Sequence, residues 1–203
     1  MPTFRALLLG TVCCALSACD GLDLGVSRAA PERVQLADGL IIAGAEGWCV
    51  DSASSQTGDA RAVVVLGSCA AIAGADYATP DIDGVVTVSV DAAGAASPSL
   101  DALESFFSTE AGRAALARNG QANSVDILDM DVRDDMLVLH AADESTGPGM
   151  APEVWRALFD LDGRFVSVSV FAVADQQIAP ELGRATLSDQ VEELRSKNAN
   201  TEL

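Results

Sequence analysis

Five aspartates stand close together in the stretch DILDMDVRDD, which covers residues 126–135. Carboxylate oxygens are the ligands that hard cations such as Ca²⁺ prefer, so three of them converging on one face would hold a cation. The acids alternate with apolar residues, which instead predicts a strand with its acids in solvent. The residues expected to face the core are Val125, Ile127, Met130 and Val132. We therefore assign no metal site, and keep Asp126, Asp129 and Asp131 as the carboxylates that a cation would use.

His140, the only histidine, ends the apolar stretch MLVLH and is the one side chain suited to general base catalysis near neutral pH. Hydrolysis would also need a nucleophile and an orienting acid in a recognisable setting, and no Gly-x-Ser-x-Gly motif occurs. A nucleotide-binding loop is missing too, because the only lysine, Lys197, follows no glycine-rich segment. We expect His140 to be a structural or surface residue, and we expect neither an enzyme nor a cofactor.

The first 18 residues have the order of a secretory signal peptide. Arg5 precedes a short apolar stretch, ALLLGTVCCAL, and two small residues, Ser17 and Ala18, follow it. An apolar core of this length is too short to span a bilayer as a stable helix. We therefore predict an export signal over residues 1–18.

The tetrad Leu16-Ser17-Ala18-Cys19 resembles the lipobox of bacterial lipoproteins at every position. In that family the cysteine thiol takes a diacylglyceryl group, and the signal peptidase cuts before the cysteine. The resemblance implies that Cys19 is the lipidated first residue of the mature chain. Two or three acyl chains, at ~0.8 kcal/mol per buried methylene, would anchor the domain to the cell membrane on its periplasmic side. Both the inner and the outer membrane remain compatible with the motif.

Two cysteines are left after this processing, Cys49 and Cys69, because Cys13 and Cys14 leave with the leader. In an oxidising compartment such a pair is most simply a disulfide, which would stabilise the fold by ~3 kcal/mol in the chain-entropy model. A redox pair would favour Cys-x-x-Cys spacing, and a metal site would need further ligands.

Charge limits the partners that this chain can bind. The net charge is −18 and the pI is near 4.1. Nucleic acid binding needs clustered Lys and Arg, whereas the arginines are scattered along this sequence, so we exclude it. The acidity is compatible both with solubility and with cation binding.

The organisation of the chain predicts one domain. After Cys19, the polar and small-residue segment of residues 19–32 is expected to be a flexible tether, and residues 33–203 to be the folded part. Two short strands should turn at Asp38–Gly39, and further strands are expected at 61–70 and 84–92. The continuous Val and Leu of 61–70 predict that both its faces are covered. Two hairpins should follow, one over 124–140 and one over 153–173 that turns at Asp162–Gly163.

Helices are expected in two places. Residues 99–118 carry a helical apolar stripe that ends at Asn119–Gly120, and Thr186 should cap a last helix. The sum is an α+β fold, with an antiparallel sheet of about six to eight strands packed by two helices. This arrangement is loosely similar to the PsbP-like fold of membrane-associated accessory proteins, a likeness that implies no function.

The segments LIIAGAEGWCVDSASS and VVVLGSCAAIAG resemble a group of uncharacterised lipoproteins from marine alphaproteobacteria. Some of these are called cation transport ATPase or dihydroxy-acid dehydratase. This sequence supports neither activity, because it has no spanning helices, no Asp-Lys-Thr-Gly motif and no cysteine set for an iron–sulfur cluster. The resemblance strengthens the pairing of Cys49 with Cys69.

These observations predict a lipid-anchored envelope protein that acts as a non-catalytic binding or accessory module for an envelope protein partner not named by the sequence. The alternative is a lipoprotein that binds a cation or small ligand through clustered carboxylates.

Overall fold

The structure, a computed structural model, describes residues 29–58, 60–74, 76–94, 97–174 and 176–199. The expected leader, Cys19 and most of the expected tether lie outside these ranges. The strands are β1 Arg33–Gln35, β2 Ile41–Ala43, β3 Trp48–Val50, β4 Gln56–Thr57, β5 Arg61–Ser68, β6 Gly84–Asp91, β7 Val125–Arg133, β8 Met136–Asp143, β9 Met150–Leu161 and β10 Arg164–Val173. The helices are α1 Cys69–Ala73, α2 Leu100–Phe107, α3 Glu110–Leu116 and α4 Pro180–Asn198, with a short 3-10 turn at Ala122–Ser124.

Eight strands form one antiparallel sheet in the order β3-β5-β6-β10-β9-β8-β7, with β4 paired to β5. The hairpin β1–β2 forms a separate two-stranded sheet. The α+β class and the antiparallel sheet expected from the sequence are confirmed.

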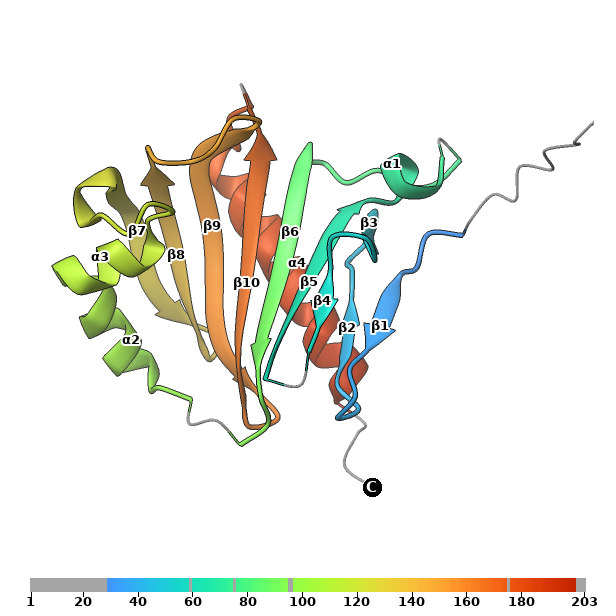
Figure 1. Cartoon of the computed structure of the whole chain (residues 1–203), viewed down its shortest axis with the longest axis horizontal. Coiled ribbons are helices and arrows are strands. Elements are labelled where there is room, and N and C mark those ends of the chain that lie inside the picture. The colour runs from blue at the N-terminus through green and yellow to red at the C-terminus, as the bar shows by residue number, and fades with distance from the viewer. Residues whose placement is uncertain (1–28, 59, 75, 95–96, 175, 200–203) are drawn as a thin grey trace, which may run out of the picture.

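The helices cover the two faces of the sheet unequally (Figure 1). α4 crosses one face, where Leu187, Val191 and Leu194 join the main core. α2 and α3 lie on the opposite face over β7 and β8, where Leu103 and Phe107 pack on β8 and β9. Among the described helices, α2 and α3 leave β5 and β6 uncovered on that second face, and α1 contacts β5 only at its end, where Ile72 lies beside Gly67. The sheet is therefore a middle layer that is closed on one side and half covered on the other.

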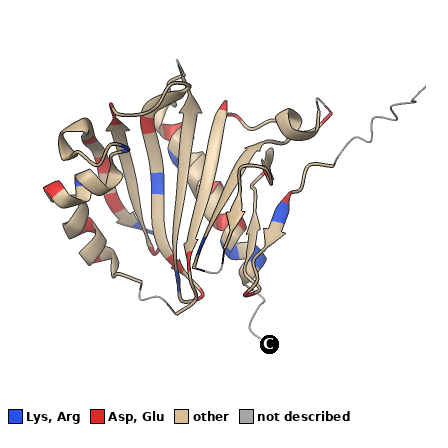
Figure 2. Cartoon of the chain, in the orientation of Figure 1, with Lys and Arg blue, Asp and Glu red and all other residues tan. Residues whose placement is uncertain are grey.

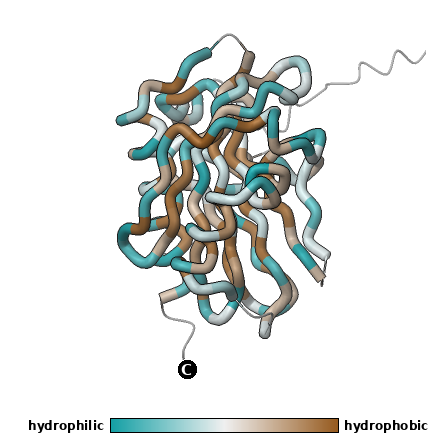
Figure 3. The backbone as a smooth tube through the Cα atoms, turned by 90° about the vertical axis from the view of Figure 1, so that its left-hand side faces the viewer, coloured by the Kyte–Doolittle hydropathy of each residue, from teal (hydrophilic) through white to brown (hydrophobic). Residues whose placement is uncertain are grey.

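Alternation along the strands explains this asymmetry. In β6, Val86, Val88 and Val90 are buried beneath α4, whereas Thr87 and Ser89 on the other face are only partly buried. Hydrophobic residues run through the middle of the strands, and hydrophilic ones gather in the loops (Figure 3). A strand with one wet face was expected for β6, and it is found.

The expectation for β5 was wrong in one respect. Ala62, Val64 and Leu66 are buried on the α4 side, but Val63 and Val65 on the other face are half-buried. A run of valines satisfies a strand with one uncovered face as well as one with two covered faces, because β-branched residues favour strands in either setting. The sequence pattern therefore did not distinguish the two.

The expected hairpin turns are present. Asp134 and Asp135 join β7 to β8 with φ of 47° and 56°, and Asp162 and Gly163 join β9 to β10 with φ of 52° and 69°. Positive φ at both central residues gives the turn whose twist matches that of the flanking strands. Each turn returns the chain directly to its neighbouring strand.

The single helix expected over residues 99–118 is two helices in the structure. The first ends at Phe107 with Ser108 as its C-cap, and Thr109 caps the second, because its Oγ1 accepts a hydrogen bond from the Gly112 N–H at 3.1 Å. Gly112 also lets the helices approach closely, since a Cβ there would lie 2.1 Å from the Phe106 carbonyl oxygen. The break bends the polypeptide so that both helices lie on the sheet.

The last helix begins at Pro180 rather than near Thr186. Proline suits the first helical position because its φ is already helical and no N–H partner is needed there. The sequence pattern did not predict this earlier start, because Gly183 lies in the second turn and glycine disfavours helix interiors.

Candidate functional site

Cys49 and Cys69 form a disulfide, as the sequence predicted, with their Cα atoms 4.8 Å apart. Cys49 ends up on β3 and Cys69 opens α1 directly after β5, so the bond links a short strand to its neighbour's end. Both cysteines are buried in a small cluster with Ala30. The bond is therefore shielded from solvent, in keeping with a structural role.

The last residues of the expected tether lie along this part of the domain. The Pro31 carbonyl oxygen accepts a hydrogen bond from the Val50 N–H at 2.7 Å, and the Glu32 carbonyl oxygen accepts one from the Gly44 N–H at 3.0 Å. Because these contacts begin before Arg33, residues 30–32 belong to the folded domain rather than to a tether.

The carboxylates that a cation would use share one face of β7 but are divided by their partners. Asp129 accepts a hydrogen bond from Arg184 of α4 at 2.9 Å, and Asp131 pairs with Arg133. A bulge between Ile127 and Asp129 resets the alternation. No group of three His, Cys, Asp or Glu within the described ranges could hold a metal ion. Two of the three carboxylates are thus engaged in ion pairs.

His140 is a buried residue of β8, the strand that lies between β7 and β9. Its ring stacks on that of Trp155, with centroids 3.8 Å apart and an angle of 11° between the planes. Its Nε2 lies 3.0 Å from a carboxylate oxygen of Glu153. Only 8% of His140 and 1% of Trp155 are exposed. This geometry fixes the imidazole in the core, in accordance with the structural role expected for it.

Trp155 also packs against the first turns of α4. The Arg184 guanidinium lies 5.4 Å from the Trp155 ring centroid, and a Cβ on Gly183 would lie 2.3 Å from Trp155 Nε1. The aromatic residues Trp48, Trp155 and Phe159 all belong to the main core, and of these three Trp48 also borders a hollow at the surface, beside α4.

Two buried polar residues of α4 have backbone partners on the hairpin β1–β2. Gln190 donates to the Ala43 carbonyl oxygen at 2.6 Å, and Asn198 donates to the Ile41 carbonyl oxygen at 2.9 Å. Sequence reasoning missed both, because a polar residue on an amphipathic helix gives no sign of its partner. Their contacts attach the hairpin to the helix.

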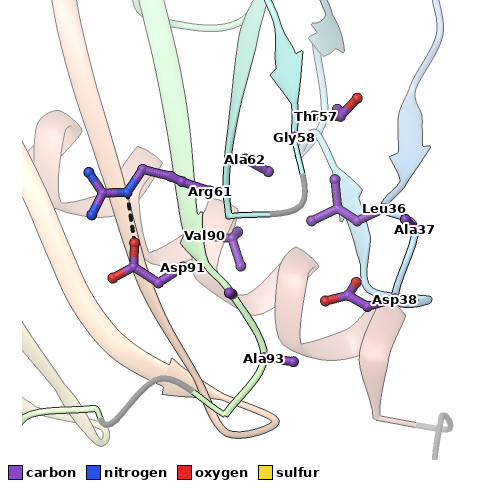
Figure 4. Close-up of a pocket in the computed structure, with 11 residues that line it drawn as sticks. Leu36, Ala37, Asp38, Thr57, Gly58, Arg61, Ala62, Val90, Asp91 and Ala93 are labelled. Atoms are coloured by element: carbon purple, nitrogen blue, oxygen red, sulfur yellow. Dashed lines mark hydrogen bonds and ion pairs between the residues drawn. The ribbon is translucent and has the colours of Figure 1, made fainter.

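A hollow of about 380 Å³ lies between the β1–β2 turn and the lower ends of β5 and β6 (Figure 4). Arg61 and Asp91 pair at one side of it, 2.7 Å apart, and Asp38 lies across it. Burial alone would raise the pKa of Asp38, but hydrogen bonds from Arg164 and from the Leu40 N–H lower it below its usual value. The charges around this hollow are therefore already paired within the protein.

A second hollow, of about 680 Å³, lies beside the outer surface of α4. Its carboxylates are Glu46, Asp81, Asp189, Glu192 and Glu193. Acidic residues on an exposed helix surface are most simply explained as a solvated face. Within the described residues, these carboxylates do not form a group that could hold a metal ion.

The uncovered half of the sheet is the remaining candidate. Its residues come from three adjacent strands and are joined by the strand register: Val63 and Val65 of β5, Thr87 and Ser89 of β6, and Ser167 and Ser169 of β10. We call this surface the open face. Apart from Arg61, Asp91 and Arg164 at one end of the sheet, β5, β6 and β10 carry no charged residue (Figure 2). These six side chains present hydroxyl and methyl groups, and the half-buried Phe165 and Phe171 flank the two serines on the same face of β10.

Arg156 stands at the border between the open face and the helix-covered half. In the strand register it lies between Leu139 of β8 and Ser169 of β10. Its Nε donates a hydrogen bond to Ser169 Oγ at 2.9 Å, and Ser169 is only 3% exposed. Burial lowers the pKa of the Arg156 guanidinium, which still stays charged in proteins. Sequence patterns do not reveal this residue, because only the strand register shows that its neighbour on β10 is a hydroxyl.

No protein-family model matches this chain, and no curated protein proved similar to it. In the part of the chain that the structure describes, no helix has the length and apolar character needed to cross a membrane.

Proposed function

We propose that this protein is an exported lipoprotein, anchored to the bacterial cell membrane through acyl chains on Cys19. Its domain binds another envelope component across the open face and carries out no catalysis. The lipobox tetrad supports the anchor, and the open face supports the binding role.

The open face carries the proposal because it is the part of the sheet that the fold leaves uncovered. A half-buried β-sheet surface of valines and hydroxyls can bury its methyl groups against a partner while its hydroxyls form hydrogen bonds. Val63, Val65 and Thr87 are each only partly buried in the chain alone. Association over the open face would complete the second covering layer, as α4 does on the opposite face.

The arrangement of His140 supports a non-catalytic role. Its ring is stacked on Trp155 and its Nε2 faces Glu153, so the imidazole is held by structural contacts. A general base must instead reach the proton of a bound substrate.

The anchor is tested by mass spectrometry of the mature N-terminus and by incorporation of an alkyne-labelled fatty acid. We expect acylated Cys19, and we expect Cys19→Ser to abolish the label. The matched control, Cys14→Ser in the leader, should keep it. An unmodified Cys19 in the mature chain would refute the lipoprotein assignment.

The binding role is tested by in-cell crosslinking from a photoreactive residue placed at Thr87 or Ser89. We expect a discrete crosslinked product from each. The same residue at Ser188, which is exposed on α4, is the control and should give none. Products from Ser188 alone would place the interface elsewhere.

The alternative, cation binding through the acidic run, has weaker support. Asp129 and Asp131 already have arginine partners, so a cation would have to displace Arg184 and Arg133. The thermal stability of the protein in sub-millimolar CaCl₂ tests this alternative.

A further inference from the structure

Arg156 differs from the other arginines that line the sheet. Arg61, Arg133, Arg164 and Arg184 each pair with an aspartate. Arg156 makes one side-chain hydrogen bond among the described residues, to the neutral hydroxyl of Ser169, and no carboxylate of those residues lies within ion-pair distance. A half-buried cation is thus left without a counter-charge.

A charge withdrawn from water without a partner is unfavourable, and the cost is offset when a carboxylate binds it. The guanidinium group suits this role because its planar fork can donate two parallel hydrogen bonds to one carboxylate. The Ser169 hydroxyl accepts from Arg156 and so keeps its own proton to donate. The partly exposed Arg156 guanidinium therefore offers an incoming carboxylate its remaining N–H donors at the edge of the open face, beside the buried Ser169 hydroxyl.

We propose that the open face binds a peptide segment of a partner protein that is uncharged apart from a single carboxylate, which pairs with Arg156. The segment's apolar side chains pack on Val63 and Val65, and the hydroxyls of Thr87, Ser89 and Ser167 bond to its polar groups. This inference rests on the proposed function and names the chemistry of the partner.

Net charge determines why the segment has one carboxylate rather than an acidic run. The chain carries a charge of −18, which would repel a strongly acidic partner or an anionic membrane surface. At physiological ionic strength the screening length is about 8 Å, so one carboxylate next to Arg156 responds mainly to its local surroundings. Those surroundings are the uncharged central parts of β6 and β10.

A second copy of this chain fits the surface poorly. In a dimer with a two-fold axis through this face, each copy would offer the other its own open face, whose six residues include no carboxylate to pair with Arg156. Charge complementarity therefore favours a different protein as the occupant.

The test is selection of peptides from a displayed random library against the full chain in mild detergent. We expect enrichment of peptides with one Asp or Glu flanked by apolar residues. A synthetic peptide of that sequence should bind Arg156→Gln at least about tenfold more weakly than wild type. Arg156→Lys should show an intermediate loss, because it keeps the charge without the fork.

The matched control is Arg33→Gln, which removes the same charge from an exposed position on β1 and should leave the affinity unchanged. Replacing the peptide's acid with its amide should weaken binding to wild type but not weaken it further in Arg156→Gln. Circular dichroism of each variant confirms that it is folded.

Failure to enrich acid-containing peptides, or equal binding to Arg156→Gln, would overturn the inference. Vesicles of phosphatidylglycerol provide a separate probe, and binding to them that depends on Arg156 would assign the site to a lipid headgroup instead. Crosslinks from Thr87 that persist in Arg156→Gln cells would leave the proposed function intact and refute the carboxylate. If the photoreactive residue at Thr87 or Ser89 gives no crosslinked product in the otherwise wild-type chain, the proposed function is refuted.

Discussion

Asp143 illustrates how single carboxylates of this acidic chain are used within the fold. It is buried at the end of β8 and accepts hydrogen bonds from the Arg118 N–H at 2.7 Å and the Ser145 N–H at 2.9 Å. Burial alone would raise its pKa, but these bonds and the Ser145 hydroxyl lower the pKa below its usual value. The charged form is therefore bound more favourably in the folded state.

We expect Asp143→Asn to lower the free energy of unfolding by ~1–2 kcal/mol at pH 7. Because the folded pKa lies below the unfolded value, the carboxylate's contribution is fully present above the unfolded pKa and is lost as the pH falls through the lowered pKa. Urea unfolding from pH 7 to pH 2.5 should show the two proteins converging in acid, a range set by the unperturbed Asp pKa of ~3.9. Glu144→Gln, at the exposed neighbouring position, should behave like wild type at every pH.

Gly183 provides a second prediction at the scale of one residue. A Cβ at this position would lie 2.3 Å from Trp155 Nε1 and 2.5 Å from Cδ1, so Gly183→Ala must displace either the ring or the helix. Overpacking should outweigh the gain in helix propensity and lower stability by ~2 kcal/mol. Thermal unfolding measures this, with Ser188→Ala on the exposed side of α4 as a control that should be neutral or slightly stabilising. A stabilised Gly183→Ala would contradict the contact between α4 and Trp155.

At the scale of elements, the disulfide attaches the short strand β3 to the rest of the sheet. β3 has three residues and pairs only with β5 in the described sheet, and Cys49 and Cys69 are separated by 20 residues. We expect Cys49→Ala with Cys69→Ala to cost ~3 kcal/mol by the loop-closure term. Urea unfolding with and without reductant checks this.

Reductant gives this experiment its control. It should lower the stability of wild type toward that of the double variant and leave the double variant unchanged. Equal stability of wild type and double variant without reductant would mean that the bond contributes little.

Local chemistry explains which elements the sequence could predict. The turn at Asp162–Gly163 was predicted from a residue pair that tolerates positive φ between alternating strands. The break between α2 and α3 was not, because Phe106 and Phe107 continue the apolar stripe into α3. Its signal was Thr109 followed by Glu110, the usual start of a new helix.

The candidate site depends on relations that the sequence does not carry. Arg156 and Ser169 are 13 residues apart and meet only through the register of β9 with β10. Val63 and Val65 are half-exposed because α2 and α3, which lie on the same face of the sheet, do not extend as far as β5. Periodicity identifies the two faces of a strand, but tertiary packing decides which face is covered.

At the scale of the whole molecule, the charge of −18 is balanced only in part. Arginine and lysine side chains of the described residues form five ion pairs with carboxylates, and most of the acids have no cationic partner among them. Like charges on a compact surface repel one another and destabilise the folded state. Salt should therefore stabilise this protein.

We expect the Tm to rise by several degrees as NaCl increases from about 0.02 M to 0.5 M, because the screening length falls from roughly 20 Å to 4 Å. If screening is the whole cause, MgCl₂ and CaCl₂ at matched ionic strength give nearly the same rise. A cation site at Asp126, Asp129 and Asp131 would behave differently, since tight binding stabilises the folded state at ligand concentrations too low to change the ionic strength. Additional stabilisation by sub-millimolar CaCl₂ that Asp131→Asn removes would favour the cation-binding alternative over the accessory role, whereas its absence leaves the open face as the better-supported site.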